Sequence, residues 1–332
     1  MGKEYDEARD QALSATPYDD VFRTLLVDCS GLVYPLLNEI FGEHYGKDVI
    51  LDFHQNEHYL KQQNGAEEKR ITDESFDVLD SARNFLKKYH LECQTNPDNS
   101  IALRFFEYDS QIAKESGVLT GNKFVVTYPN SAVLFLRSSG SMGSSLTVEI
   151  VTPGGKLQYD IKALRLQDYT IEELFAKQLY ILLPYSMFYF EKDLEQYEQD
   201  SEAREKLEQA FADIADGLAD AARRGDINPF QLMLLIDMMK KTNYNVARNQ
   251  PQVVKGVETV MGGHVIEDYP TKKIFNAGKE EGREEDREEV TFVFGKLLEA
   301  GRTDDLQKAV QDKVYLDRLI QEFQENPDGE LK

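Results

Sequence analysis

The spacing of apolar residues changes twice along the chain, and the order of these patterns limits the folds that it can adopt. Between residues 19 and 41, apolar residues recur at helical spacing. Short segments rich in β-branched and aromatic residues follow as far as residue 169, interrupted by one helical pattern at 98–116. From Thr170 onward the spacing is helical again. The sequence therefore predicts an α/β protein with a helical second half.

The first part of this pattern predicts the order helix, three strands, helix, strand. The helix over 19–41 is expected to be kinked near Gly31 or Pro35, because both residue types weaken a helix interior. Asp98 is the expected cap of the second helix. The three strands are predicted at Val49–Phe53, Ile71–Leu79 and Phe85–Gln94.

The second part of the pattern divides the rest of the chain. Pro153-Gly154-Gly155 separates two strand-like segments and signals a β-hairpin. The expected organisation is an N-terminal arm at 1–16, a core at 17–140, a β-hairpin and helical extension at 141–275, a charged helical segment at 276–323 and a disordered tail at 324–332.

The chain is strongly acidic, with 38 Lys and Arg against 60 Asp and Glu, a net charge of −22. This charge argues against a broad basic surface for nucleic acid, so any contact with DNA has to be local. Two cysteines do not make a disulfide framework and suit a reducing compartment. The N-terminus lacks a signal-like apolar stretch, and the longest apolar run is about half of a membrane span. We expect a cytoplasmic protein without a membrane partner.

Acidic and amide side chains occur on the second and third predicted strands. Alternation along the third strand places His90, Glu92 and Gln94 on one face and Leu91 and Cys93 on the other. If Asp73 on the second strand faces Glu92, the two carboxylates and the Cys93 backbone carbonyl form an oxygen-rich site suited to Mg²⁺. Carboxylates on strands are more often simply solvated, so the spacing does not decide between these interpretations.

A resemblance to a known family favours the metal site. The chain resembles the recombination-promoting nuclease and putative transposase family of the PD-(D/E)XK nucleases. The segments that carry the resemblance are Pro17–Arg23, Arg70–Asp73, Tyr89–Gln94, Asp98, Arg104–Tyr108 and the later Gly278–Gly282.

The resemblance implies a restriction-endonuclease-like fold and a DNA endonuclease that depends on Mg²⁺ or Mn²⁺. In it, Asp73 and Glu92 match the metal-binding acids, and Gln94 stands where most of the superfamily has lysine. Asp19 matches an acid of the family's first helix, although a capping role is the simpler interpretation. No proline precedes Asp73, and a glutamine cannot supply positive charge, so slow catalysis is expected.

Four further residues are candidates for a supporting role. Arg104 and Tyr108 lie four apart on one helix face and look like the Arg and Tyr pair of the family. In that role Arg104 would contact a phosphate or brace Glu92, and Tyr108 would close the site. The competing interpretation is an exposed pair. Lys87 and Lys88 supply local positive charge for a phosphate or guard a strand edge.

Two other classes of function remain open. Residues 54–58 spell H-x-x-E-H, the motif of inverted zinc peptidases, but His54 and His58 would bind zinc together only on a helix, and the segment follows a strand-like run. The second alternative is a weak or inactive nuclease-fold protein that acts as a binding or assembly module. The glycine-containing acidic C-terminal segment could then mediate homo-oligomer formation. The sequence does not choose among recombination, mobile elements and phage defence.

Overall fold

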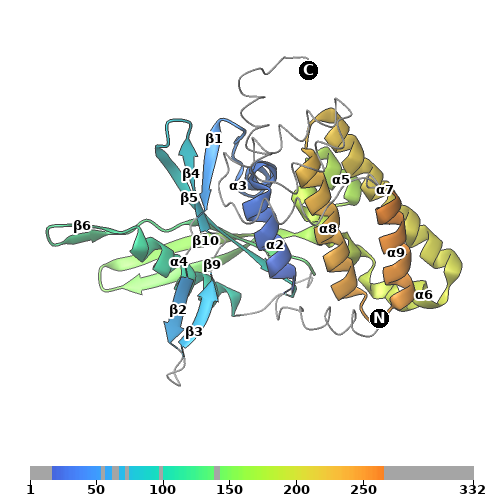
Figure 1. Ribbon diagram of the computed structural model, residues 1–332. Coiled ribbons are helices and arrows are strands. Elements are labelled where there is room, and N and C mark those ends of the chain that lie inside the picture. Colours follow the sequence, from blue (N-terminus) through green and yellow to red (C-terminus); the bar gives the residue numbers. More distant parts are fainter. Residues whose placement is uncertain are drawn as a thin grey trace, which may run out of the picture. The chain divides into compact units, whose positions relative to one another are not determined.

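The computed structural model describes residues 17–53, 75–96, 100–137 and 143–262, and the backbone alone of 57–61, 67–71 and 263–264. Over these residues the chain is a mixed α/β protein. It has a six-stranded mixed sheet, two small two-stranded hairpins and a helical C-terminal part (Figure 1).

The six-stranded sheet has the order β1-β4-β5-β8-β10-β9. Its strands are β1 (Val49–Phe53), β4 (Ser75–Asp80), β5 (Phe85–Gln94), β8 (Asn130–Phe135), β9 (Ser145–Thr152) and β10 (Gly155–Arg165). Strand β5 is antiparallel to β4 and parallel to β8, while β8 is also parallel to β10. The two hairpins pair β2 (Glu57–Lys61) with β3 (Glu67–Ile71) and β6 (Val118–Thr120) with β7 (Lys123–Val125).

The predicted break in the first helix is confirmed. Helix α2 (Pro17–Asp28) begins at a proline, which is favourable in a first turn, and the 3₁₀ turn η1 (Ser30–Leu32) separates it from α3 (Val33–Phe41). The two helical parts are bent by 101°. Gly42 ends α3 in the left-handed conformation, with φ 69°, and donates its N–H to the Asn38 carbonyl. The break lets two short helices bury their apolar faces in different directions.

Within the described part of the chain, no single helix is long and apolar enough to cross a membrane. Helices α2 and α3 are long and apolar enough only when taken together, and they are bent at the break between them. Residues of both helices, such as Phe22 and Leu36, are buried in the protein core.

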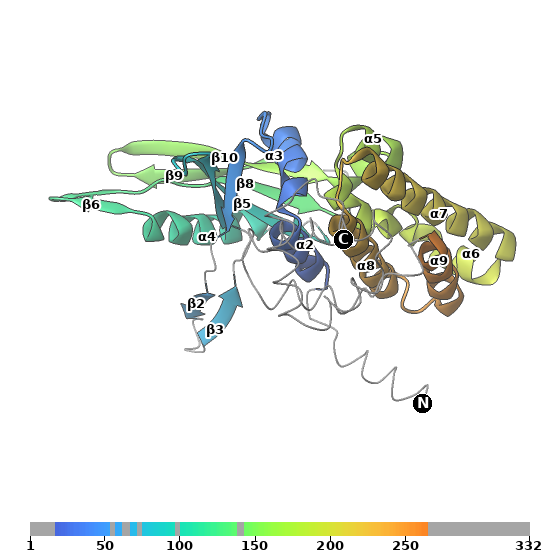
Figure 2. The ribbon, with the colours of Figure 1, turned by 45° about the horizontal axis from the view of Figure 1, so that its top comes forward.

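Helix α4 (Ile101–Glu115) packs its apolar side against the sheet (Figure 2). Ile101 and Phe105 form a core cluster with Val133 and Phe135 of β8 and Ile161 of β10. Leu103 points the other way and is 59% exposed. The 3.6-residue spacing of the helix thus fixes which of its side chains can reach β5, β8 and β10.

The structure corrects two expectations from the sequence and confirms a third. The second sheet strand begins at Ser75, not at Ile71, because Ile71 belongs to β3, which pairs with β2 in a separate two-stranded sheet. The hairpin at Pro153-Gly154-Gly155 does form, and its strands β9 and β10 join the same sheet as β8. The predicted helix after Thr170 is short: α5 ends at Ala176, Gln178 follows with a positive φ of 57°, and the apolar stretch that contains Pro184 is 3₁₀.

The remaining described elements are helical. They are η2 (Leu166–Asp168), α5 (Ile171–Ala176), η3 (Tyr180–Tyr189), η4 (Glu191–Asp193), α6 (Leu194–Gln199), α7 (Ser201–Arg224), α8 (Pro229–Val246) and α9 (Pro251–His264). Contacts divide the chain into two compact units, 1–207 with 237–256, and 208–236 with 257–332. The sheet and helices α2, α3 and α4 all belong to the first unit.

We predict that Phe105→Ala lowers the free energy of unfolding by about 3–4 kcal/mol, because it leaves a cavity between α4 and the sheet. Leu103→Ala on the same helix removes an exposed side chain and is expected to change it by less than about 0.5 kcal/mol. Urea denaturation followed by circular dichroism measures both. Equal losses in the two variants would contradict this packing.

Candidate functional site

One face of β5 carries the polar residues of the candidate site. Side chains of His90 and Gln94 contact helix α4, and Glu92 lies between them on the same face. Leu91 and Cys93 alternate with these residues and are buried, 1% and 2% exposed. The predicted division of the strand into two faces is confirmed. It also separates Cys93 from His90, so these two residues do not form a nucleophile and base pair.

Glu92 is a buried carboxylate, 6% exposed. Its Oε1 lies 3.6 Å from His90 Nε2, a distance for an ion pair but too long for a good hydrogen bond. A second acid is close by: burial, and then repulsion from Glu92, raise the pKa of Asp19 to about 6. Asp19 lies in the first turn of α2, a helix that contacts β5. The fold therefore brings two carboxylates from separate elements together at low exposure.

His90 connects this acid to a buried network on α4, β8 and β10. Its Nδ1 is 2.7 Å from Asp109 Oδ1, and both side chains are fully buried. Ser131 Oγ donates to the same oxygen at 2.8 Å, and the Tyr159 hydroxyl donates to Oδ2 at 3.4 Å. Burial lowers the pKa of His90, but the Asp109 hydrogen bond and the nearby Glu92 outweigh it and raise that pKa to about 10. The fold therefore favours the protonated form of His90, which lies between the carboxyl groups of Asp109 and Glu92.

Arg104 and Tyr108 face the sheet and are not the exposed pair that was the competing interpretation. Arg104 Nη2 donates to Gln94 Oε1 at 2.9 Å. Tyr108 is 8% exposed, and its ring lies edge-on to the His90 ring with centroids 6.1 Å apart. Spacing of four along α4 thus places a guanidinium over the end of β5 and an aromatic ring over its middle.

Lys87 and Lys88 have carboxylate partners, which corrects the expectation of a small basic patch at these residues. Lys88 is 7% exposed, and its Nζ is 2.7 Å from Asp77 Oδ1 on β4. Lys87 forms an ion pair with Glu43. Because each charge is compensated within the fold, neither lysine adds net positive charge for a phosphate.

Several predicted residues lie outside the described residues or only partly within them. Asp73 and Asp98 are outside, as is His54. His58 is in strand β2, of which only the backbone is described. This strand contradicts the helix that a zinc peptidase needs for its two histidines, so the H-x-x-E-H interpretation is wrong.

The described residues do not form a complete metal site. Among them, no three His, Cys, Asp or Glu side chains converge for a metal ion. Glu92 and Asp19 nevertheless fit a divalent cation in their chemistry: both are hard oxygen donors, and repulsion from Glu92 adds to the effect of burial in raising the pKa of Asp19. A cation would relieve this repulsion. Asp73, expected to be a further ligand, precedes the first residue of β4 by two positions.

Comparison of the chain with protein-family models, with curated proteins and with solved structures finds no match.

Sequence reasoning missed the Asp109, Ser131 and Tyr159 network. A signal was present, because Asp109 lies four residues after Phe105 and therefore falls on the apolar side of its helix. A charged residue at such a position needs a buried partner. Ser131 gave no such signal, because serine occurs on buried and exposed strands alike and does not by itself indicate a buried partner.

We predict that Asp19→Asn raises the free energy of unfolding at pH 7, without divalent cations, by about 1–2 kcal/mol. A raised carboxyl pKa means that folding favours the protonated form, so stability is lost as the pH rises from about 4 to about 6. The gain should therefore vanish near pH 4. Asp20→Asn, in the same turn and 3.8 Å from Arg23, is the control and should give no gain. Urea denaturation at the two pH values tests the difference.

We also predict that His90 makes stability fall at alkaline pH. Its folded-state pKa of about 10 lies above the ordinary 6.5, so its contribution is complete below pH 6.5 and is lost as the pH rises through 10. The urea midpoint of the wild type should fall across this window more steeply than that of His90→Gln. Parallel profiles for the two proteins would show that His90 is not charged in the fold.

Proposed function

We propose that the chain is a metal-dependent DNA endonuclease that hydrolyses phosphodiester bonds with a restriction-endonuclease-like core. The observation that carries the proposal is the position of Glu92 and Gln94 on one face of β5, with Asp19 of α2 and Arg104 of α4 beside them. Acids, an amide and one guanidinium at low exposure are the groups that phosphoryl transfer needs.

The order of elements supports the finer assignment of the fold. A helical segment, strands β1, β4 and β5, helix α4 and strand β8 follow one another, and β5 and β8 are parallel neighbours. This is the helix, three strands, helix, strand order that the resemblance implies, with the β2–β3 hairpin inserted after β1.

The metal ligands in this proposal are Asp73, Glu92 and the Cys93 backbone carbonyl, with Asp19 as a fourth candidate. Strand β4 begins two residues after Asp73, and Ser75 at its start pairs with His90 on β5. When bound, Mg²⁺ or Mn²⁺ would lower the pKa of a water molecule and neutralise charge that develops on the phosphate.

The side chains themselves have separate roles. His90 lies beside Glu92, with its Nε2 3.6 Å from Glu92 Oε1, and Asp109 fixes the position of the His90 ring. Gln94 keeps its amide N–H groups for the attacking water, because its Oε1 already accepts from Arg104. In this proposal Arg104 contacts a phosphate oxygen from the same position.

The second candidate is a protein that keeps this fold and binds DNA or another copy of itself without cleavage. It is favoured by the contact of Arg104 Nη2 with Gln94 Oε1, because this hydrogen bond engages two groups of the proposed site with each other. Biological settings such as recombination, mobile elements or phage defence do not distinguish the two candidates.

Cleavage of supercoiled plasmid in Mg²⁺ or Mn²⁺ tests the proposal. We expect the wild type to nick or linearise DNA, and both Asp73→Ala and Glu92→Ala to lower the rate by at least about 100-fold, since each removes an acid proposed to bind the metal. Glu107→Ala removes an exposed acid from α4 and is the matched control, with an unchanged rate.

Cleavage that is equal in all four proteins would remove these acids from the mechanism. Absence of cleavage by the wild type with either metal, together with no heat of Mg²⁺ binding in calorimetry, would favour the non-catalytic candidate.

A further inference from the structure

A cavity of about 390 Å³ lies at the start of α2, beside the candidate site. It is lined by Pro17, Tyr18, Arg137, Asn245, Val246, Arg248 and Asn249, all of them in the first compact unit. Its volume lies within the range of cavities that hold small ligands or parts of larger ones.

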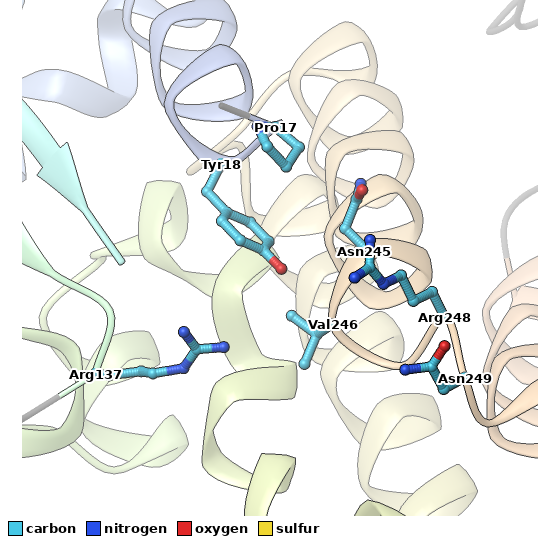
Figure 3. A pocket seen from close by; sticks show the side chains of 7 residues that line it. All are labelled: Pro17, Tyr18, Arg137, Asn245, Val246, Arg248 and Asn249. Atoms are coloured by element: carbon cyan, nitrogen blue, oxygen red, sulfur yellow. The ribbon is translucent and has the colours of Figure 1, made fainter. Parts of the chain in front are cut away.

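Five of the seven lining residues carry side-chain hydrogen-bond donors, and none is an acid. Figure 3 shows Arg137 and Arg248 on opposite sides of the cavity, with the Tyr18 hydroxyl pointing into the space between them. The amides of Asn245 and Asn249 lie beside Arg248. In a chain with a net charge of −22, a cavity lined by two arginines and by no acid suits an anion better than a cation.

The two arginines differ in their environment. Arg137 forms an ion pair with Glu191, donates to Asn96 Oδ1 at 3.2 Å and lies 5.2 Å from the centroid of the Phe188 ring. These contacts fix its guanidinium and offset its charge. Arg248 is exposed, and its charge acts on Tyr18: burial raises the pKa of Tyr18, while Arg137 and Arg248 oppose the rise. Arg248 is therefore the main source of net positive charge in the cavity.

The cavity and the candidate site share one turn of helix. Tyr18 lines the cavity, and the next residue, Asp19, lies close enough to Glu92 for each to repel the other's charge. The Tyr185 hydroxyl donates to the Tyr18 carbonyl at 3.1 Å, which holds this turn against the buried segment η3. The two arginines of the cavity therefore lie near the helical turn that carries an acid of the candidate site.

We propose that this cavity binds a phosphate group of the nucleic-acid strand that enters the candidate site, at a nucleotide next to the one that is cut. The proposal rests on the proposed nuclease function. It identifies a positive subsite that offsets the repulsion between DNA and the acids Asp19 and Glu92. Lys87 and Lys88 do not fill this role, because each already forms an ion pair with an acid of the fold. A backbone contact of this kind does not depend on base sequence.

Arg248→Ala tests the subsite, because this arginine is exposed and its loss leaves no buried acid without a partner. Arg223→Ala is the matched control: it removes the same charge from α7, where the side chain is 71% exposed and ion-paired with Asp220. Binding of a fluorescein-labelled 30-base-pair duplex is measured by anisotropy in Ca²⁺ at several salt concentrations. A parallel thermal melt in inorganic phosphate reports on binding of a free anion.

We expect Arg248→Ala to weaken duplex binding about tenfold, equally for duplexes of unrelated sequence, and to reduce the slope of log affinity against log salt by about 0.9. Arg223→Ala should bind as the wild type does. Equal affinity and equal slope in Arg248→Ala and the wild type would overturn the proposal. A second outcome would also overturn the proposal: the wild type binds inorganic phosphate but not the duplex, and Arg248→Ala loses the phosphate binding. This result would assign the cavity to a free anion.

The subsite and the nuclease function can fail separately. Duplex binding that depends on Arg248, without cleavage of plasmid in Mg²⁺ or Mn²⁺, supports the subsite and contradicts the proposed hydrolysis. Cleavage that continues with unchanged duplex affinity in Arg248→Ala contradicts the subsite alone.

Discussion

The hydrogen bond between His90 and Asp109 determines how helix α4 lies on the sheet near the candidate site. Both side chains are fully buried, and the 2.7 Å contact joins the central strand β5 to the middle of the helix. If either partner were lost, the other would remain as an uncompensated charge at low dielectric, which is far costlier than the loss of a surface pair. The bond also sets the register of α4. Arg104, earlier on the helix, consequently reaches Gln94, and Tyr108 covers the His90 ring.

Much of the fold was predictable because it follows from local periodicity. The kink near Gly31, the strands Val49–Phe53 and Phe85–Gln94, and the two faces of the latter all followed from the spacing of apolar residues. The hairpin at 57–71 was missed, since its strands are rich in charged residues and carry little apolar alternation. Contacts distant in sequence were the least accessible: nothing in the neighbourhood of Ser131 or Tyr159 indicates that both donate to Asp109.

In the candidate site, too, local spacing was predictable and contacts between distant residues were not. Glu92, Gln94 and Arg104 were identified by spacing and resemblance, and the structure brings them together. Lys87 and Lys88 were expected to supply positive charge, but Glu43 and Asp77 compensate them. Ion pairs between strands and loops have no sequence period, so the charge balance of a surface is visible only once the partners are known. Because the chain has a net charge of −22, the local balance of charge determines where a polyanionic partner can bind.

The parallel pairing of β5 with β8, and of β8 with β10, has a consequence for the order in which the site is made during synthesis. Strands β1, β4 and β5 can pair soon after residue 94 leaves the ribosome, because they are close in sequence. The partners of Asp109 come later: Ser131 lies on β8, and Tyr159 lies on β10. A nascent chain therefore carries Glu92 for more than 60 residues before the buried network that orients its histidine neighbour is complete. Assembly of the acidic site is in this sense a late event, coupled to closure of the far half of the sheet.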